Sequence, residues 1–250
     1  MKINLQDVTF LILVRLDSIE RMENILVVTS QLCKHFETNI TVLEASKYCN
    51  GILKKALNRR VNYYFVRDND PVLYKTFYFN KMALEVKTPY MAIWDTDIAV
   101  DKKAVVDAIK ILRGHADVVY PYDGCCYNVS SIIRDLYLIR NDIRILYRNK
   151  NKMEILHNRA LVGGAVFVRT DKYKCCGMEN EKHYGWGNDD FDRYYRFVNL
   201  GMNIHRNENP LFHLYHPRLK NSDYRSILHN QNTKRELAKT ENSSRDELLK

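Results

Sequence analysis

Apolar and polar residues follow two different periods along the first hundred residues. Short apolar runs are typical of buried strands. These runs lie at residues 8–14, 40–43, 61–66 and 90–94. Segments in which apolar residues recur every three or four positions predict amphipathic helices. These segments lie at residues 19–36, 47–58 and 75–86. The alternation of strand and helix predicts an α/β fold with a mostly parallel, Rossmann-like sheet and helices on both faces.

The second half continues this alternation with longer elements. It predicts a helix at 102–113, a strand at 118–121, a long basic helix at 132–148 and a strand directly after Gly163 and Gly164. The arginines of the long helix, at positions 134, 140, 144 and 148, most simply form a solvated face, and an anionic lipid surface is the alternative. No repeat or break in composition divides residues 1–228, which predicts a single domain. The polar segment 229–250 predicts a peripheral helix or a frayed end.

Composition narrows the class of protein. A chain of 250 residues with 46% hydrophobic and 28% charged residues is ordinary for a soluble globular protein. The N-terminus lacks the pattern of a signal peptide, and no apolar run reaches the ~18 residues of a membrane span, so we expect a cytoplasmic protein. The six cysteines include no Cys-x-x-Cys pair, which argues against a zinc ribbon or a redox motif. The net charge of +9 favours an anionic partner without choosing between nucleotide, lipid and nucleic acid.

Two carboxylates follow the predicted strand at residues 90–94. Asp95 and Asp97 lie one residue apart, with the uncharged Thr96 between them. Like charges this close repel unless a cation lies between them, and ligands bind at strand carboxyl ends in open α/β sheets. The segment therefore indicates a divalent-metal site. Two turn-forming aspartates in a solvated loop are the alternative.

A second chemical segment is Gly-Trp-Gly-Asn-Asp-Asp at residues 185–190. Glycines on both sides leave Trp186 free to present its indole as a stacking surface for a sugar ring. Asp189 and Asp190 then open a predicted helix, whose dipole stabilises an ionised carboxylate of the kind a general base requires. A helix cap with an acidic first turn is the alternative.

Two histidines complete the set of candidate groups. His213 and His216 lie three residues apart in an apolar segment. Imidazole is a common metal ligand, so the pair fits a site begun by Asp95 and Asp97. Taken singly, each histidine is more often a satisfied residue of the core.

The order of these motifs resembles that of inverting nucleotide-sugar glycosyltransferases of the A-type fold. The likeness is to the C-terminal motif of the β-1,4-galactosyltransferases and to bacterial polysaccharide-polymerising transferases such as chondroitin polymerase. It extends from Val8 to about Arg218. The resemblance implies that Asp97 and His216 bind metal and that Asp95 faces the nucleotide ribose and the metal. His213 falls where the galactosyltransferases place a second, sulfur ligand.

The same resemblance assigns the remaining roles. Asp190 matches the catalytic base, Trp186 and Asp189 match contacts to the acceptor sugar, and Gly164 matches a contact to the donor. Positions that resemble the uridine-binding edges of the first two strands are Arg15, Asp17 and Glu44. The chain departs from the family at Asn188, where the family has glycine, at the shorter acid Asp189, and at Phe191, where the family has an acid. These departures concern the acceptor and the linkage.

The resemblance implies a metal-dependent, inverting hexosyltransferase with Mn²⁺ as cofactor and Mg²⁺ as the alternative. The donor would be a UDP-sugar bound by residues 1–100, and the acceptor a saccharide or lipid-linked saccharide bound by residues 101–228. Bacterial surface polysaccharide synthesis is the implied setting, in the cytoplasm or peripheral to the inner face of the membrane. One alternative is a nucleotidyltransferase that makes nucleotide sugars, although residues 15–18 lack the glycine-rich loop of such enzymes. The other is a basic nucleic-acid-binding module, but the basic residues are scattered and form no such motif.

Overall fold

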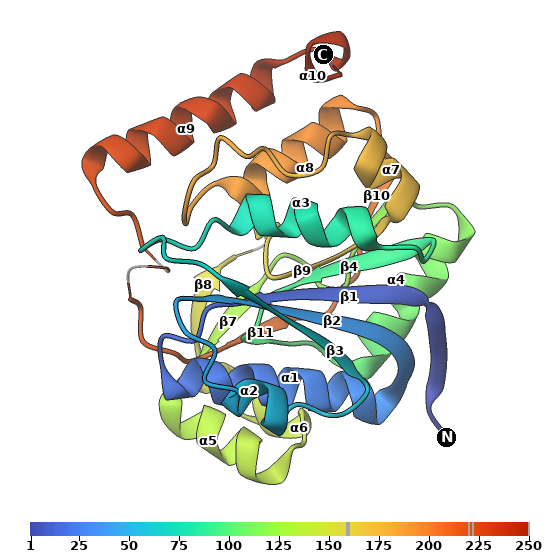
Figure 1. Cartoon of the computed structure of the whole chain (residues 1–250). Helices are drawn as coiled ribbons and strands as arrows, with labels where there is room; N and C mark the ends of the chain where they lie inside the picture. Colours follow the sequence, from blue (N-terminus) through green and yellow to red (C-terminus); the bar gives the residue numbers. More distant parts are fainter. Residues whose placement is uncertain (159–160, 220, 222, 250) are drawn as a thin grey trace.

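The computed structural model describes residues 1–158, 161–219, 221 and 223–249. Within them a seven-stranded sheet forms the centre of the molecule (Figure 1). Its order is β10 (Ile204–Arg206), β6 (Val118–Tyr120), β9 (Ala165–Arg169), β4 (Tyr90–Trp94), β1 (Ile3–Val14), β2 (Phe36–Ser46) and β3 (Val61–Arg67). Neighbouring strands are parallel except at β9, which runs antiparallel to both β4 and β6. The predicted α/β fold with a mostly parallel sheet is confirmed.

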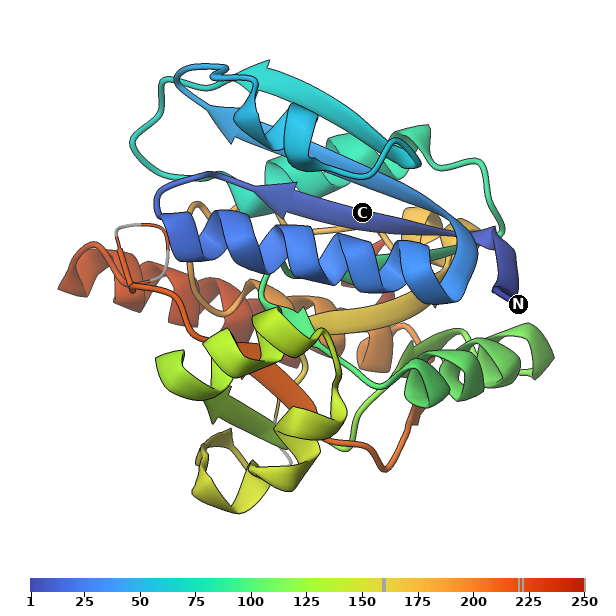
Figure 2. The same cartoon turned by 90° about the horizontal axis from the view of Figure 1, so that it is seen from below.

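Helices cover both faces of this sheet. In Figure 1, α3 (Lys75–Glu85), α7 (Thr170–Cys175) and α8 (Asp189–Asn199) lie above it. On the other side lies α1 (Ile19–His35), and Figure 2 shows this face with α4 (Lys102–Gly114) at its edge. The helix α1 begins where the sequence predicts, because the Ser18 hydroxyl accepts a hydrogen bond from the Arg21 backbone N–H. None of the helices in the described ranges is both long and apolar enough to cross a bilayer.

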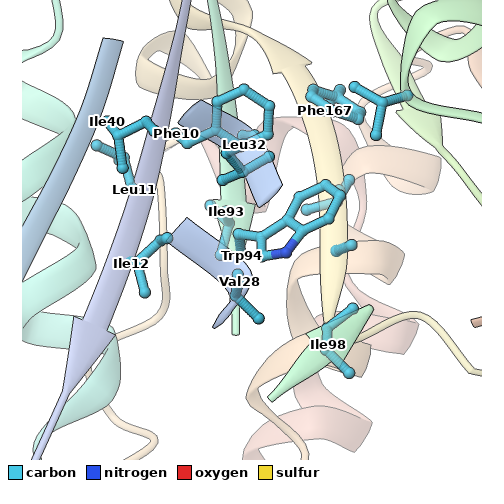
Figure 3. Close-up of a cluster of buried hydrophobic side chains, with 14 of the residues drawn as sticks. Phe10, Leu11, Ile12, Val28, Leu32, Ile40, Ile93, Trp94, Ile98 and Phe167 are labelled. Atoms are coloured by element: carbon cyan, nitrogen blue, oxygen red, sulfur yellow. The ribbon is translucent and has the colours of Figure 1, made fainter. Parts of the chain in front are cut away.

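The core is centred on three aromatic side chains. Phe10 of β1, Trp94 of β4 and Phe167 of β9 meet edge to face, with ring centroids 5.4–5.7 Å apart (Figure 3). Edge-to-face packing suits the quadrupoles of aromatic rings and adds to the hydrophobic term. All three are buried, so the strand that leads into Asp95 is held rigidly in the middle of the sheet.

A second, four-stranded sheet was not predicted. Its order is β5 (Ile98–Ala99), β11 (Leu211–Leu214), β7 (Cys126–Val129) and β8 (Glu154–His157). Strands of two to four residues are too short to show a period, so the residues around His213 were recognised only as an apolar segment.

Two helix predictions were wrong in extent. The helix expected at 47–58 is limited to α2 (Ile52–Ala56), because Gly51 before it adopts the left-handed conformation with φ 71°. The helix expected at 132–148 is broken into α5 (Ser131–Arg140) and α6 (Arg144–Arg148) by Asn141, which is left-handed with φ 49°. Asparagine tolerates this conformation better than most residues.

The expected solvated arginine face of this segment is wrong at one position. Arg134 is buried, and its guanidinium donates to the Asn24 side chain and the Glu20 carbonyl of α1. The arginine thus fastens α5 to α1. In the polar C-terminal segment, the structure shows the predicted peripheral helix as α9 (Ile227–Asn242), followed by the short α10 (Arg245–Leu248).

Candidate active site

The carboxyl end of β4 and the start of β9 form the floor of the site. The strands are antiparallel, with Trp94 opposite Ala165, and the Asp95 backbone N–H donates to the Gly164 carbonyl over 2.8 Å. This pairing brings the Asp-x-Asp segment against the glycine pair. A cavity of about 370 Å³ opens above them. The predicted site residues that line it are Asp95, Asp97, Gly164, Trp186, Asp189, Asp190, His213 and His216.

Asp97, His213 and His216 converge on one point of this cavity. One potential ligand atom from each lies within 4.8 Å of the other two. Strand β11 places His213, which pairs with Ile98 of β5, and the Leu214 N–H donates to the Asp97 carbonyl. His216 follows two residues after the end of this strand. The His216 Nε2 lies 3.2 Å from Asp97 Oδ2, and the His213 Nε2 lies 3.9 Å from Asp97 Oδ1.

The chemistry of these three groups fits a divalent cation. Burial by itself would raise the pKa of Asp97, but His213, His216 and Arg21 outweigh it and hold the pKa well below its usual value. Burial lowers the pKa of His213 and so favours the neutral imidazole that binds metal. The Nδ1 of His213 is buried without a hydrogen-bond partner in the described part of the chain. Two imidazoles with one carboxylate suit Mn²⁺ better than Mg²⁺, which prefers oxygen ligands.

Asp95 lies outside this three-residue cluster and faces Lys75 at 3.8 Å. Burial is the largest cause that raises the pKa of Asp95, and the carboxylates of Asp190 and Asp97 raise it further. Together they outweigh Lys75, so the pKa of Asp95 is raised to about 7. Asp95 and Asp97 therefore have different electrostatic surroundings although they are one residue apart.

The opposite wall of the cavity carries the two acids that open α8. The Asp190 carboxylate forms ion pairs with two cations. Its Oδ1 lies 2.6 Å from the Arg193 guanidinium and 3.5 Å from the Lys75 Nζ. Lys75 also lies 3.1 Å from Asp189. Burial raises the pKa of Asp190, but Lys75 and Arg193 outweigh it, so the net pKa is lowered and the carboxylate is ionised. The Asp190 side chain is 25% exposed and the Asp189 side chain 6%, so Asp190 is the more accessible acid.

Trp186 lines the cavity and is 38% exposed. It meets Tyr224 edge to face, with the centroids 5.0 Å apart. Gly187 has φ 116°, and a side chain there would lie 2.6 Å from Tyr224, so this position requires glycine. Asn188, the departure from the family pattern, has φ 62°, a left-handed conformation that asparagine tolerates.

Three predicted nucleotide contacts do not line this cavity. Arg15 donates to the Ala45 carbonyl and pairs with Asp68, while Asp17 accepts from Arg21 and Asn221. Glu44 is buried and accepts a hydrogen bond from the Tyr63 hydroxyl. Their roles toward a nucleotide stay predictions.

Sequence reasoning missed three cations of the site, namely Arg21, Lys75 and Arg193. Arg21 lies 3.6 Å from Asp97 and is held by Asp17 four residues before it. A signal was present for Arg193, because Asp190 and Arg193 have the i, i+3 spacing of neighbours on a helix. No local signal points to Lys75, which reaches Asp189 across 114 residues of chain.

Comparisons with known proteins bear on the family and on the fold. Residues 145–218 match the family described as the N-terminal domain of galactosyltransferase. This segment contains Gly164, Trp186, Asp190, His213 and His216. The whole structure is similar to the catalytic domain of Drosophila β1,4-galactosyltransferase 7, which was solved with xylobiose. The TM-score is 0.52, the identity is 14%, and the match covers 91% of this chain and 79% of the other. The chain has the A-type glycosyltransferase fold. A search of proteins with curated functions gives no match. The family match and the fold together support a glycosyltransferase.

Proposed function

We propose that this protein is a metal-dependent, inverting glycosyltransferase. It transfers a hexose or N-acetylhexosamine from a UDP-sugar to a hydroxyl of a saccharide acceptor, in the synthesis of a bacterial surface polysaccharide. The observation that carries the proposal is the arrangement of one cavity, in which a candidate metal cluster faces an ionised, accessible Asp190. A sugar bound between them would have a cation on its leaving-group side and a base on its acceptor side.

Asp190 is the proposed general base. The acceptor hydroxyl loses its proton to this carboxylate while its oxygen forms a bond to the anomeric carbon. The bond from the anomeric carbon to the diphosphate oxygen breaks, and its electron pair leaves with the nucleoside diphosphate. Attack from the face opposite the leaving group inverts the configuration in one step, so no covalent enzyme intermediate forms. Lys75 and Arg193 keep Asp190 ionised and fix its direction before the acceptor arrives.

Asp97, His213 and His216 would hold the cation, which when bound neutralises charge on the departing diphosphate. Arg21 places a second positive charge beside Asp97 and is placed to attract the same phosphates. Trp186 offers its exposed ring to the acceptor sugar, as aromatic side chains do at carbohydrate sites. Asp189 is assigned to a hydrogen bond with that sugar.

Hydrolysis of the donor tests the proposed activity without knowledge of the acceptor, because water can replace it. We expect one UDP-hexose or UDP-N-acetylhexosamine to be hydrolysed in the presence of Mn²⁺ and not after chelation. Asp97→Ala should abolish the Mn²⁺-dependent binding of UDP in calorimetry, while His205→Ala, at an exposed histidine of β10, should not change it. No hydrolysis of any nucleotide sugar, together with metal-independent binding, would reject the proposal.

The two adjacent acids provide the sharper test. Asp190→Asn keeps the size and polarity of the side chain but cannot take a proton, so turnover should fall by roughly 10²–10⁴-fold with UDP affinity little changed. Asp189→Asn should leave most of the donor hydrolysis intact and raise the KM for a saccharide acceptor. The reverse result would move the base by one residue, and normal turnover in both variants would remove α8 from the chemistry.

A further inference from the structure

A second cavity adjoins the Asp-x-Asp segment and is separate from the active-site cavity. Its volume is about 570 Å³, which lies in the usual range of small-molecule sites. In the described part of the chain, Ile98 is the one residue that lines both cavities. Trp94 lines the second cavity, whereas Asp95, the next residue, lines the active site. A molecule in the second cavity would therefore contact β4 without entering the active site.

The interior of this cavity is apolar and includes three aromatic rings. Its buried lining residues come from α1, β2, β4, β5, α4 and α5, and they are Val28, Leu32, Phe36, Trp94, Ile98, Ala99, Val105 and Tyr137. Figure 3 shows Val28, Trp94 and Ile98 in the same part of the core. Aromatic side chains stack on, or pack edge to face against, other aromatic rings. The interior therefore suits a planar aromatic molecule.

Two polar groups of these lining residues lack partners. In the part of the chain that the structure describes, the Trp94 Nε1 is buried without a hydrogen-bond partner, and the Tyr137 hydroxyl makes no hydrogen bond either. Both residues are only 2% exposed. An unpaired buried donor is costly, and an indole N–H can only donate. A ligand that satisfies Trp94 must therefore carry an acceptor atom at its inner end.

The exposed residues of the lining are all basic. They are Lys34, Lys102, Arg140 and Arg144. Two carboxylates of the lining offset part of this charge, because Asp142 pairs with Arg144 over 2.7 Å and Asp101 caps α4. The other three cations take part in no ion pair with the residues that the structure describes. The outer end of the cavity therefore suits one acidic group.

His35 forms a polar wall beside two of these cations. Burial lowers the pKa of His35, Lys102 and Lys34 lower it further, and Asp101 acts in the opposite direction. The Nε2 of the neutral ring lies 2.9 Å from the Gln31 side-chain oxygen. The Gln31 amide in turn donates to the Asn141 carbonyl over 3.1 Å. Because Gln31 ties α1 to the end of α5, this wall is already formed before a ligand arrives.

We propose that the second cavity binds a small planar aromatic acid with a hydroxyl or carbonyl oxygen at the end opposite its acidic group. The ring packs among Phe36, Trp94 and Tyr137. The inner oxygen accepts a hydrogen bond from the Trp94 Nε1, and the acidic group faces Lys34 and Lys102. Apolar walls with a few placed polar groups are the usual composition of a small-molecule site.

This inference does not depend on the proposed reaction, and the chain supplies its own reporters. It has two tryptophans, and each lines a different cavity. The two indole N–H signals in a nitrogen–proton NMR spectrum of the intact protein therefore report on the two cavities separately, and Trp186→Phe assigns them. We expect 6-hydroxy-2-naphthoate to shift the Trp94 signal in a saturable way, with a Kd of about 1 mM or tighter. The Trp186 signal should stay in place.

Two related probes separate the contributions of the ligand's two ends. The compound 2-naphthoate lacks the inner oxygen and should bind about fivefold more weakly, because the Trp94 N–H stays unpaired. The compound 6-(hydroxymethyl)-2-naphthol is neutral and should bind about threefold more weakly, because it has no charge to face the lysines.

Adjacent lysines provide a matched pair of variants. Lys102→Gln removes a cation that lines the cavity, whereas Lys103→Gln removes its exposed neighbour, which does not line it. Lys102→Gln should weaken binding of 6-hydroxy-2-naphthoate about threefold and leave the neutral probe unaffected, and Lys103→Gln should change neither. Val105→Phe places a ring in the cavity and should abolish binding, with circular dichroism as the check on its fold. The lysine pair keeps the test decisive if that variant does not fold.

Three results would overturn the inference. One is the absence of a saturable shift in either indole signal. Another is a shift of the Trp186 signal in place of the Trp94 signal, which would put the probe in the active site. The third is the same change in affinity in Lys102→Gln and Lys103→Gln, which would show only general attraction of an anion to a basic protein.

Discussion

A single lysine organises the acidic wall of the cavity. The Lys75 ammonium lies within 4 Å of Asp95, Asp189 and Asp190, and the three carboxylates raise its pKa well above the usual value even though burial opposes them. One cation among three acids does not neutralise them all. Burial and the neighbouring carboxylates outweigh Lys75 at Asp95 and raise the pKa of Asp95 to about 7. Asp190 has the help of Arg193 as well, which explains why its pKa falls while that of Asp95 rises.

Removal of this lysine should change the pH dependence of the enzyme. Lys75 lowers the pKa of Asp190, so in Lys75→Met the carboxyl should protonate at higher pH. The acidic limb of kcat/KM for donor hydrolysis should move upward by about one pH unit or more, as expected for the loss of a close opposite charge. The measurement is a pH–rate profile of both proteins. Lys81→Met, at an exposed lysine of the same helix, is the control and should keep the original limb. An unshifted limb in Lys75→Met would show that Lys75 does not set this ionisation.

At the scale of elements, the sequence patterns predicted the strands and helices whose apolar residues recur with a regular period. Strand β4 was predicted with its observed bounds, and it carries Asp95 and Asp97 to the sheet edge. The break between α5 and α6 was missed because one asparagine with a left-handed backbone leaves the apolar period almost unchanged. The second sheet was missed because its strands are very short. The roles of Asp97, His213 and His216 came from a resemblance, and their proximity depends on the pairing of β5 with β11.

The contact between the glycine pair and α8 can be tested with one methyl group. A Cβ at Gly163 would lie 2.3 Å from the Asp190 Oδ2, and Arg193 and Lys75 hold that carboxylate in place. Gly163→Ala should therefore displace Asp190 and reduce turnover by about 10²-fold, since small misplacements of a catalytic group are costly. Calorimetry should show UDP affinity nearly unchanged.

Gly114 is a suitable comparison for this substitution. It ends α4, and a Cβ there meets no atom within 4 Å, so Gly114→Ala should leave turnover unaltered. If Gly163→Ala were as active as Gly114→Ala, the carboxylate of Asp190 would not need its observed position, and its assignment as the base would be wrong.

At the scale of the whole molecule, the C-terminal segment is joined to the helix that carries the candidate base. The Thr240 hydroxyl of α9 donates to Asp192 of α8 over 2.8 Å, and the Asn199 side chain donates to the Thr240 carbonyl over 2.8 Å. These contacts are hydrogen bonds between polar groups, so α9 lacks the apolar stripe that would have predicted its docking site. Its amino acids predicted a peripheral helix, and its partner could only come from the structure.

The same network contains a buried histidine that should make stability depend on pH. His183 lies 2.7 Å from Asp192, with Asp189 and Glu179 also nearby, and together these carboxylates raise its pKa although burial opposes them. A raised pKa in the folded state stabilises the protein fully below the unfolded value of about 6.5, and the contribution disappears as pH rises through the folded pKa.

We therefore expect the difference in unfolding free energy between the natural protein and His183→Gln to shrink as pH rises above about 6.5. The change should be about 1.4 kcal/mol for each unit between the two pKa values. Urea unfolding followed by tryptophan fluorescence at several pH values measures this difference, and His205→Gln, at an exposed histidine, should show no such trend. A difference that stays constant or grows with pH would mean that His183 is neutral in the folded protein and that Asp192 holds α8 and α9 together without it.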